Sequence, residues 1–232
     1  MGEGKKQALR VTFNCRLKLE FHGANITSDA GLLVYRELDE ALELTARSGG
    51  LLDDWRTGKN TQHSLVALLR QSIFSRLAGY EDTNDAERLA VDPTMRQVVG
   101  GRATERSAAS TSQMGRFETE VLTQPRNLAE LTRLSGIWIE ELRERQPMRE
   151  LILDMDSSVS ETYGEQEGTA YNGHFDCTCY HPLFCFNQFG DVERALLREG
   201  NVHSAKDWRS VLEPAAARYR SQKIPCYFRA DA

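Results

Sequence analysis

The sequence predicts an α+β protein with α/β character, in which a helical domain precedes an incomplete mixed β-sheet. Before Pro147 the apolar residues recur mainly with the three-and-four spacing of helices. After Pro147 short apolar and aromatic runs alternate with Gly-rich and polar turns, which is typical of strands. We therefore divide the chain into a mainly helical domain, residues 1–147, and a sheet domain, residues 148–232.

Residues 10–21 alternate enough to form a strand, and three longer helices follow in the first domain. The first covers residues 32–42 after a cap at Ser28-Asp29, the second covers residues 64–78 and stops at Gly79, and the third runs from Pro125 to Pro147. The apolar stripe of the first helix consists of Leu32, Leu33, Tyr35, Leu38 and Leu42.

The second domain reads as three strands, a helix and a further strand. The strands are expected over residues 150–155, 180–189 and 192–198, and the helix begins at a Ser204 cap and extends to Tyr219. A last strand covers residues 224–228. We expect the first three strands to be antiparallel and the helix to be a crossover. The chain ends directly after the last strand, so we expect a truncated sheet with one face uncovered.

The composition is that of a globular protein with its own core. The 232 residues are 40% hydrophobic and 27% charged. No apolar run approaches the ~20 residues that cross a bilayer, and the polar start is unlike a signal peptide. Five scattered cysteines favour reduced thiols and a cytoplasmic setting. The net charge of −5 argues mildly against a general nucleic-acid-coating protein.

Acidic residues directly follow two of the predicted strands. Asp154 and Asp156 are two positions apart, so both side chains can lie on one face of a strand, and Asp231 follows the last strand. Carboxylates gathered at neighbouring strand ends can hold Mg²⁺ for phosphodiester chemistry. The alternative is that these are loop-edge aspartates, with Asp156 capping its own turn.

Two other segments could carry a function. His174, Cys177, Cys179 and His181 offer zinc ligands, but a Cys-x-Cys pair is tighter than the usual spacing, and a half-buried strand explains the segment as well. Residues 110–117 could form a helix that presents polar side chains and Arg116 to DNA, or an ordinary capped surface helix.

Several motifs, taken together and in order, strongly resemble one family. In the second half they are LDMDSS (153–158), YGEQEG (163–168), YNGH (171–174), CYHPL (179–183), GNVHSA (200–205) and FRADA (228–232). In the first half they are TSDAGLL (27–33), GYEDTND (79–85) and residues 112–118. The chain resembles bacterial insertion-sequence transposases of the DDE type, specifically insertion-sequence family thirteen-eighty, transposase DDE domain group 1.

This resemblance implies a ribonuclease-H-like catalytic domain that holds two divalent ions, Mg²⁺ or Mn²⁺, with an Asp, Asp, Glu set. The first acid matches Asp156, with Asp154 as an alternate, and the second matches Asp231. The third acid has no counterpart in the chain, so the two-ion site is incomplete. Asp176 departs from the small residue expected at its position.

The resemblance also implies the partners and the setting. The partners would be DNA, both the terminal repeats of the element and the target, bound by a homodimer through the helical domain with Arg116 among the contacts. The protein would be cytoplasmic, associated with the bacterial nucleoid and independent of membranes. Two functions follow: a transposase with little strand-transfer activity, or a non-catalytic DNA-binding and dimerising remnant.

Overall fold

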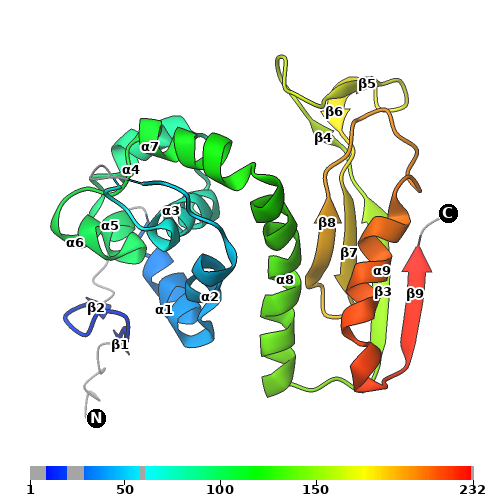
Figure 1. The fold of residues 1–232 in the computed structure, drawn as a ribbon, viewed down its shortest axis with the longest axis horizontal. Coiled ribbons are helices and arrows are strands. Elements are labelled where there is room, and N and C mark those ends of the chain that lie inside the picture. The colour runs from blue at the N-terminus through cyan, green and yellow to red at the C-terminus, as the bar shows by residue number, and fades with distance from the viewer. Residues whose placement is uncertain (1–8, 20–28, 58–60, 231–232) are drawn as a thin grey trace, which may run out of the picture. The chain divides into compact units, whose positions relative to one another are not determined.

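The computed structural model describes residues 9–19, 29–57 and 61–230, and the chain divides into two compact units, residues 1–130 and 131–232. Helices dominate the first unit and a mixed sheet dominates the second, which is the predicted α+β arrangement (Figure 1). The division falls inside helix α8, Pro125–Arg145. Most of α8 therefore belongs with the sheet, whereas the sequence grouped all of it with the helical domain.

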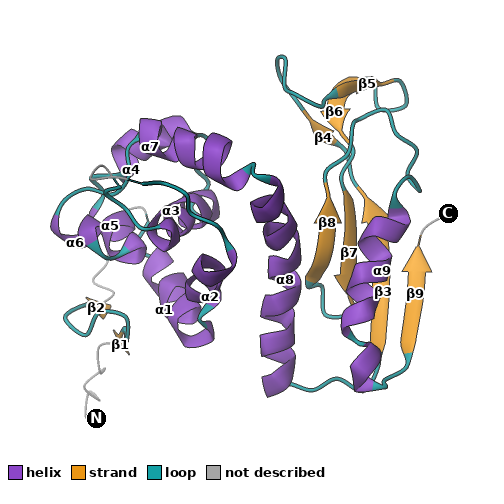
Figure 2. Ribbon diagram, in the orientation of Figure 1, coloured by secondary structure: helices purple, strands orange, loops and turns teal. Residues whose placement is uncertain are grey.

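The first unit is a set of mostly short helices around one core (Figure 2). They are α1 Leu32–Leu42, α2 Leu44–Leu51, α3 Leu65–Leu77, the 3-10 helix η1 Thr83–Asp85, α4 Ala86–Leu89, α5 Pro93–Val99, α6 Arg102–Glu105, α7 Thr111–Arg116 and the π-helix η2 Phe117–Leu122. Phe74, Met95 and Val98 are almost completely buried in this core. Burial of such side chains is the main favourable contribution to folding of the unit.

Helix α3 confirms the predicted helix of residues 64–78. The Ser64 hydroxyl accepts a hydrogen bond from the Ala67 N–H at 3.2 Å, and this bond satisfies one of the free donors at the helix start. Gly79, which follows the helix, has φ +84°, a left-handed conformation that glycine adopts without strain.

Helix α1 is present, and the predicted apolar stripe is partly confirmed: Leu32 is buried in the core and Leu33 packs against it, but the rest of the stripe does not follow. Tyr35 is 55% exposed and Leu38 is 51% exposed, while Arg36 and Asp39 are buried. The Asp39 carboxylate pairs with Arg36 and accepts hydrogen bonds from the Thr45 N–H at 2.7 Å and the Thr45 hydroxyl at 2.6 Å. These hydrogen bonds replace the water that the two charged groups lose on burial, so Arg36 and Asp39 are buried and Leu38 is exposed. The predicted cap residue Ser28 lies outside the described residues.

The predicted strand of residues 10–21 is instead a short hairpin where it is described. β1, Leu9–Arg10, pairs antiparallel with β2, Lys18–Leu19. A turn between them brings the Leu17 N–H within 2.9 Å of the Asn14 carbonyl oxygen.

The second unit contains a four-stranded sheet in the order β8-β7-β3-β9. Its strands are β3 Leu151–Ser157, β7 Leu183–Asn187, β8 Val192–Leu196 and β9 Cys226–Ala230, and α9 Trp208–Arg218 and the 3-10 helix η3 Arg220–Gln222 precede β9. β7 is antiparallel to both β3 and β8, and β9 is parallel to β3. The predicted antiparallel trio, crossover helix and further strand are thus confirmed.

Helix α9 packs on one face of this sheet. Val211, Ala215 and Tyr219 follow one another at four-residue spacing and contact buried strand residues such as Leu153 and Cys185. The helix begins at Trp208, with Asp207 as its N-cap, so the predicted cap at Ser204 is wrong. Asp207 has φ 61°, and this turn starts the helix later than the sequence suggested.

A second, three-stranded sheet occupies what the sequence suggested was a connection. It consists of β4 Ser160–Glu161, β6 Cys177–Tyr180 and β5 Ala170–Asn172, in that order. The predicted strand of residues 180–189 corresponds mainly to β7, and only its first residue, Tyr180, belongs to β6. His181-Pro182 separates β6 from β7, since proline cannot donate to a strand ladder.

In the part of the chain that is described, no helix combines the length and the apolar character required to cross a bilayer.

Candidate active site

Strand β3 positions the two predicted acids on one face of the sheet. Leu151 and Leu153 are completely buried against α9, and Met155 continues this side of the strand. Asp154 and Asp156 alternate with them and therefore lie on the opposite face. Asp154 and Asp156 thus share one face of β3, as their two-residue spacing predicted.

Asp154 has both carboxylate oxygens bound by one arginine of the neighbouring strand. The Arg229 Nε donates to Asp154 Oδ1 at 2.9 Å, and Arg229 Nη2 donates to Asp154 Oδ2. The ladder brings the two together, because Asp154 and Arg229 are direct partners in the parallel pairing of β3 and β9. This fork is the favoured geometry of an arginine–carboxylate pair.

Asp156, by contrast, is exposed, and its carboxylate has no hydrogen bond or ion pair with any other residue that the structure describes. Its neighbour across the antiparallel pairing is Phe184, which offers no charge. A free carboxylate at a strand end is the donor chemistry that Mg²⁺ and Mn²⁺ require, so Asp156 can serve as a ligand. Asp154 does not offer a free carboxylate, because Arg229 donates hydrogen bonds to both of its oxygens.

The second predicted acid, Asp231, lies outside the described residues. The last described residue before it, Ala230, pairs with Met155, one position before Asp156. Among the described residues, no three histidine, cysteine or acidic side chains gather closely enough to hold a metal ion.

Two of the four possible zinc ligands, His181 and Cys179, are buried in the protein. His181 is buried, its Nδ1 lies 3.2 Å from the Val202 carbonyl oxygen, and its ring packs edge-on against Phe175 at 5.8 Å between centroids. Cys179 is completely buried in β6. Burial also raises the pKa of the Cys177 thiol, and it raises that of Cys185 in β7 to about 11. A raised pKa keeps the thiols of Cys177 and Cys185 protonated at neutral pH, which disfavours nucleophilic chemistry at these two positions.

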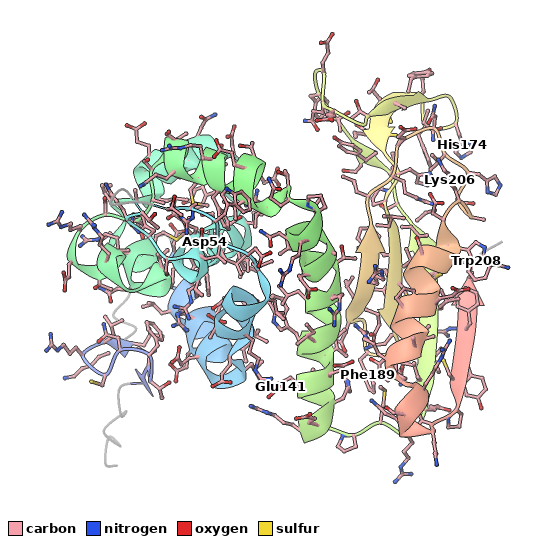
Figure 3. The ribbon with its side chains drawn as sticks, in the orientation of Figure 1. Asp54, Glu141, His174, Phe189, Lys206 and Trp208 are labelled. Carbon is pink, nitrogen blue, oxygen red and sulfur yellow. The ribbon has the colours of Figure 1, made fainter. Side chains whose placement is uncertain are left out.

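Strands β3, β8 and β9 run in the same direction, so their carboxyl ends lie at the same end of the sheet, where α9 also starts. The connection that leads to α9 is exposed, and the buried side chain of Arg198 donates hydrogen bonds to its backbone. Arg198 Nη1 donates to the carbonyl oxygens of Ser204 at 2.9 Å and Lys206 at 2.7 Å. Figure 3 shows Lys206 and Trp208 on this side of the unit. Arg198 thus holds the backbone of the GNVHSA motif in place, near the end of the sheet where β3 and Asp156 terminate.

Arg116 lies at the end of α7, where residues 110–117 were predicted to be helical. Ser110 caps this helix, and the Gln113 side chain accepts a hydrogen bond from the Ser110 N–H at 3.0 Å, which forms a capping box. Arg116 is exposed, and the contact found for its guanidinium within the described residues is from Nε to the Ser112 carbonyl oxygen at 3.3 Å. Arg116, Trp55 and Gln113 help line a cavity of about 660 Å³ within the helical unit.

The contact between Arg229 and Asp154 was missed at the sequence level. Asp154 and Arg229 are direct partners because β3 and β9 are parallel and paired in this register. Only the register, which the separate motifs do not encode, reveals that the arginine meets the first aspartate.

Comparison with known proteins identifies the family. The family model described as transposase DDE domain group 1 matches residues 9–232. No curated protein and no solved structure matches the chain significantly. Proteins of this family are transposases, which act on DNA in transposition and recombination. The match extends over nearly the whole chain, and the chain therefore belongs to the transposase DDE domain group 1 family.

Proposed function

We propose that this chain is the transposase of a bacterial insertion sequence of family thirteen-eighty. The observation that carries the proposal is the exposed, unpaired Asp156 at the carboxyl end of β3, within a chain that belongs to a DDE transposase family. The sheet order, with an antiparallel trio joined through a crossover helix to a parallel strand, agrees with the ribonuclease-H-like topology that the resemblance implies.

In this proposal Asp156 and Asp231 are the catalytic acids of this chain. They would hold divalent ions, Mg²⁺ or Mn²⁺, which supply activation of a nucleophilic oxygen and stabilisation of the leaving oxygen at phosphorus. Asp156 contributes one carboxylate from β3. Asp231 is the residue after Ala230, which ends β9 one pairing position short of Asp156. Their side chains would orient the ions against the scissile phosphodiester.

We further propose that the helical unit binds the DNA ends as part of a homodimer, with Arg116 as one of the contacts. Arg116 is exposed on a capped helix, and no carboxylate of the described residues neutralises it.

The test combines metal binding with DNA binding. The wild-type chain is titrated with Mn²⁺ by electron paramagnetic resonance, and its affinity for a duplex that carries the inverted repeats flanking its coding sequence is measured. We expect saturable Mn²⁺ binding, weakened about tenfold or more in Asp156→Asn because one of few carboxylate ligands is lost. We also expect the repeats to bind more tightly than unrelated DNA of equal length.

The matched control is Glu213→Gln, which removes an exposed carboxylate of α9 that has no ion pair within the described residues. It should leave Mn²⁺ binding unchanged. The proposal fails if Asp156→Asn and Glu213→Gln behave alike and the repeats are not preferred. Selective binding of the repeats, combined with Mn²⁺ binding that is insensitive to Asp156→Asn, would favour the non-catalytic DNA-binding remnant instead.

A further inference from the structure

The charge arrangement on the exposed face of β3 raises a question of selectivity. Asp154 and Asp156 lie on the same face of one strand, where positions two apart are separated by about 6–7 Å. Both carboxylates could therefore compete for the same cation. The structure distinguishes them, because Arg229 holds Asp154 and leaves Asp156 free.

The contact between Asp154 and Arg229 is specific to these two positions. The side chains are 37% and 62% exposed, so solvent screens their attraction, and the geometry of the contact is what selects it. Two donors on two nitrogens meet two oxygens, an arrangement that a guanidinium can make and an ammonium cannot. Within the described part of the chain, this is the one ion pair between β3 and β9.

Strand β9 has few other side-chain contacts to fix it. All five of its residues are exposed, including Tyr227 and Phe228, and in the described sheet it lies at the edge. Its backbone ladder with β3 sets the register, and the Arg229 fork adds a side-chain contact at the last but one residue of the strand.

We infer that Arg229 is a positioning residue that keeps Asp154 out of the metal site, so that cations bind through Asp156. This inference rests on the proposed function, because it concerns which of two carboxylates meets the divalent ion. It predicts that removal of Arg229 exposes a competing carboxylate, and that simultaneous removal of Asp154 abolishes this effect.

The experiment titrates the full chain with Mn²⁺ alone and follows the bound ion by electron paramagnetic resonance. Asp154→Asn should leave the Mn²⁺ affinity within about twofold of wild type, since its oxygens are already occupied. Arg229→Gln should raise the affinity about threefold to tenfold and change the spectrum of the bound ion, because a further carboxylate becomes available. The double variant Asp154→Asn/Arg229→Gln should restore the wild-type affinity and spectrum.

Two further variants separate positioning from structural support. Arg220→Gln removes an exposed arginine of η3 that has no ion pair in the described residues, and it should leave Mn²⁺ binding unchanged. Arg229→Lys retains the charge without the fork, so its affinity should lie between those of wild type and Arg229→Gln. This variant keeps the test informative if Arg229→Gln does not fold, as judged by circular dichroism.

The inference is overturned if Asp154→Asn abolishes Mn²⁺ binding, or if Arg229→Gln leaves it unchanged. It is also overturned if Arg229→Gln weakens binding and Asp154→Asn does not reverse the loss, because Arg229 would then only support the strand. Failure of the proposed function gives a different result: the wild-type Mn²⁺ binding is insensitive to Asp156→Asn.

Discussion

The acidic residues of the sheet unit differ in the availability of their carboxylates because their neighbours differ. Asp154 and Asp156 share one strand face, but only Asp154 meets a guanidinium. Glu193 in β8 is a third case: it is almost completely buried and accepts hydrogen bonds from the Tyr219 hydroxyl at 2.7 Å and the Asn187 amide at 2.8 Å. It also pairs with Arg218. Its charge is thus compensated, and its role is structural.

The first residue-scale prediction concerns alkaline stability. Burial raises the pKa of Tyr219 to about 12. A folded-state pKa above the unfolded value of about 10 means that this contribution to stability is complete below pH 10 and is lost as the pH rises toward 12. We expect Tyr219→Phe to reduce this part of the pH dependence and, through loss of the hydrogen bond to Glu193, to cost about 1 kcal/mol near pH 7.

Urea unfolding between pH 7 and pH 12 would measure this effect. Tyr227→Phe is the matched control, because Tyr227 is 54% exposed on β9 and lacks a buried partner within the described residues. Equal pH profiles for the two variants would show that the Tyr219 hydroxyl does not contribute as described.

At the scale of elements, glycine determines where the small sheet joins the larger one. A Cβ atom on Gly200 would lie 2.3 Å from the Cys179 carbonyl oxygen and 2.5 Å from the Ala170 carbonyl oxygen. Both oxygens belong to backbone of the three-stranded sheet, so they cannot move as a flexible side chain can. The close approach also allows the Asn172 amide to donate to the Gly200 carbonyl oxygen at 2.5 Å.

We therefore expect Gly200→Ala to destabilise the protein by about 1–3 kcal/mol, because a methyl group must displace packed backbone. Gly173→Ala is the control in the same sheet region, since nothing lies within 4 Å of the added atom. Thermal unfolding by circular dichroism would compare them. Indistinguishable midpoints would contradict the role of Gly200.

At the scale of the whole molecule, two compact units separate two candidate activities. Arg116 belongs to residues 1–130, whereas Asp154 and Asp156 belong to residues 131–232. Each unit has its own buried core. Effects at sites that share no contacts usually add, so we expect DNA binding and metal binding to respond to different substitutions.

Arg116→Ala should weaken binding of the flanking repeats in EDTA and reduce the salt dependence of log K by about one phosphate contact, while Mn²⁺ binding is unchanged. Asp156→Asn should weaken Mn²⁺ binding and leave binding of the flanking repeats in EDTA unchanged. Fluorescence anisotropy across a range of salt concentrations measures the first effect, with Arg16→Ala, an exposed arginine of the amino-terminal hairpin, as control. An effect of Arg116→Ala on Mn²⁺ binding, or none on DNA binding, would contradict this separation.

Much of the fold could be predicted from local patterns. The three-and-four spacing of α3 and α8 and the short apolar run of β3 each depend on neighbours in the chain, so the sequence alone indicates these elements and their order. The same holds for the shared face of Asp154 and Asp156, which follows from strand geometry. The family resemblance likewise rests on contiguous motifs.

Contacts between distant segments required the tertiary structure. The inward Arg36–Asp39 pair depends on Thr45 and Arg70, and the small sheet depends on the approach of Gly200. The pairing of Asp154 depends on Arg229, 75 residues further along the chain, which meets that aspartate through the register of β9. The sequence determined that Asp154 and Asp156 share one face of a strand. The tertiary structure determined which of them is free, because pairing of charges depends on distances in space that local periodicity does not fix.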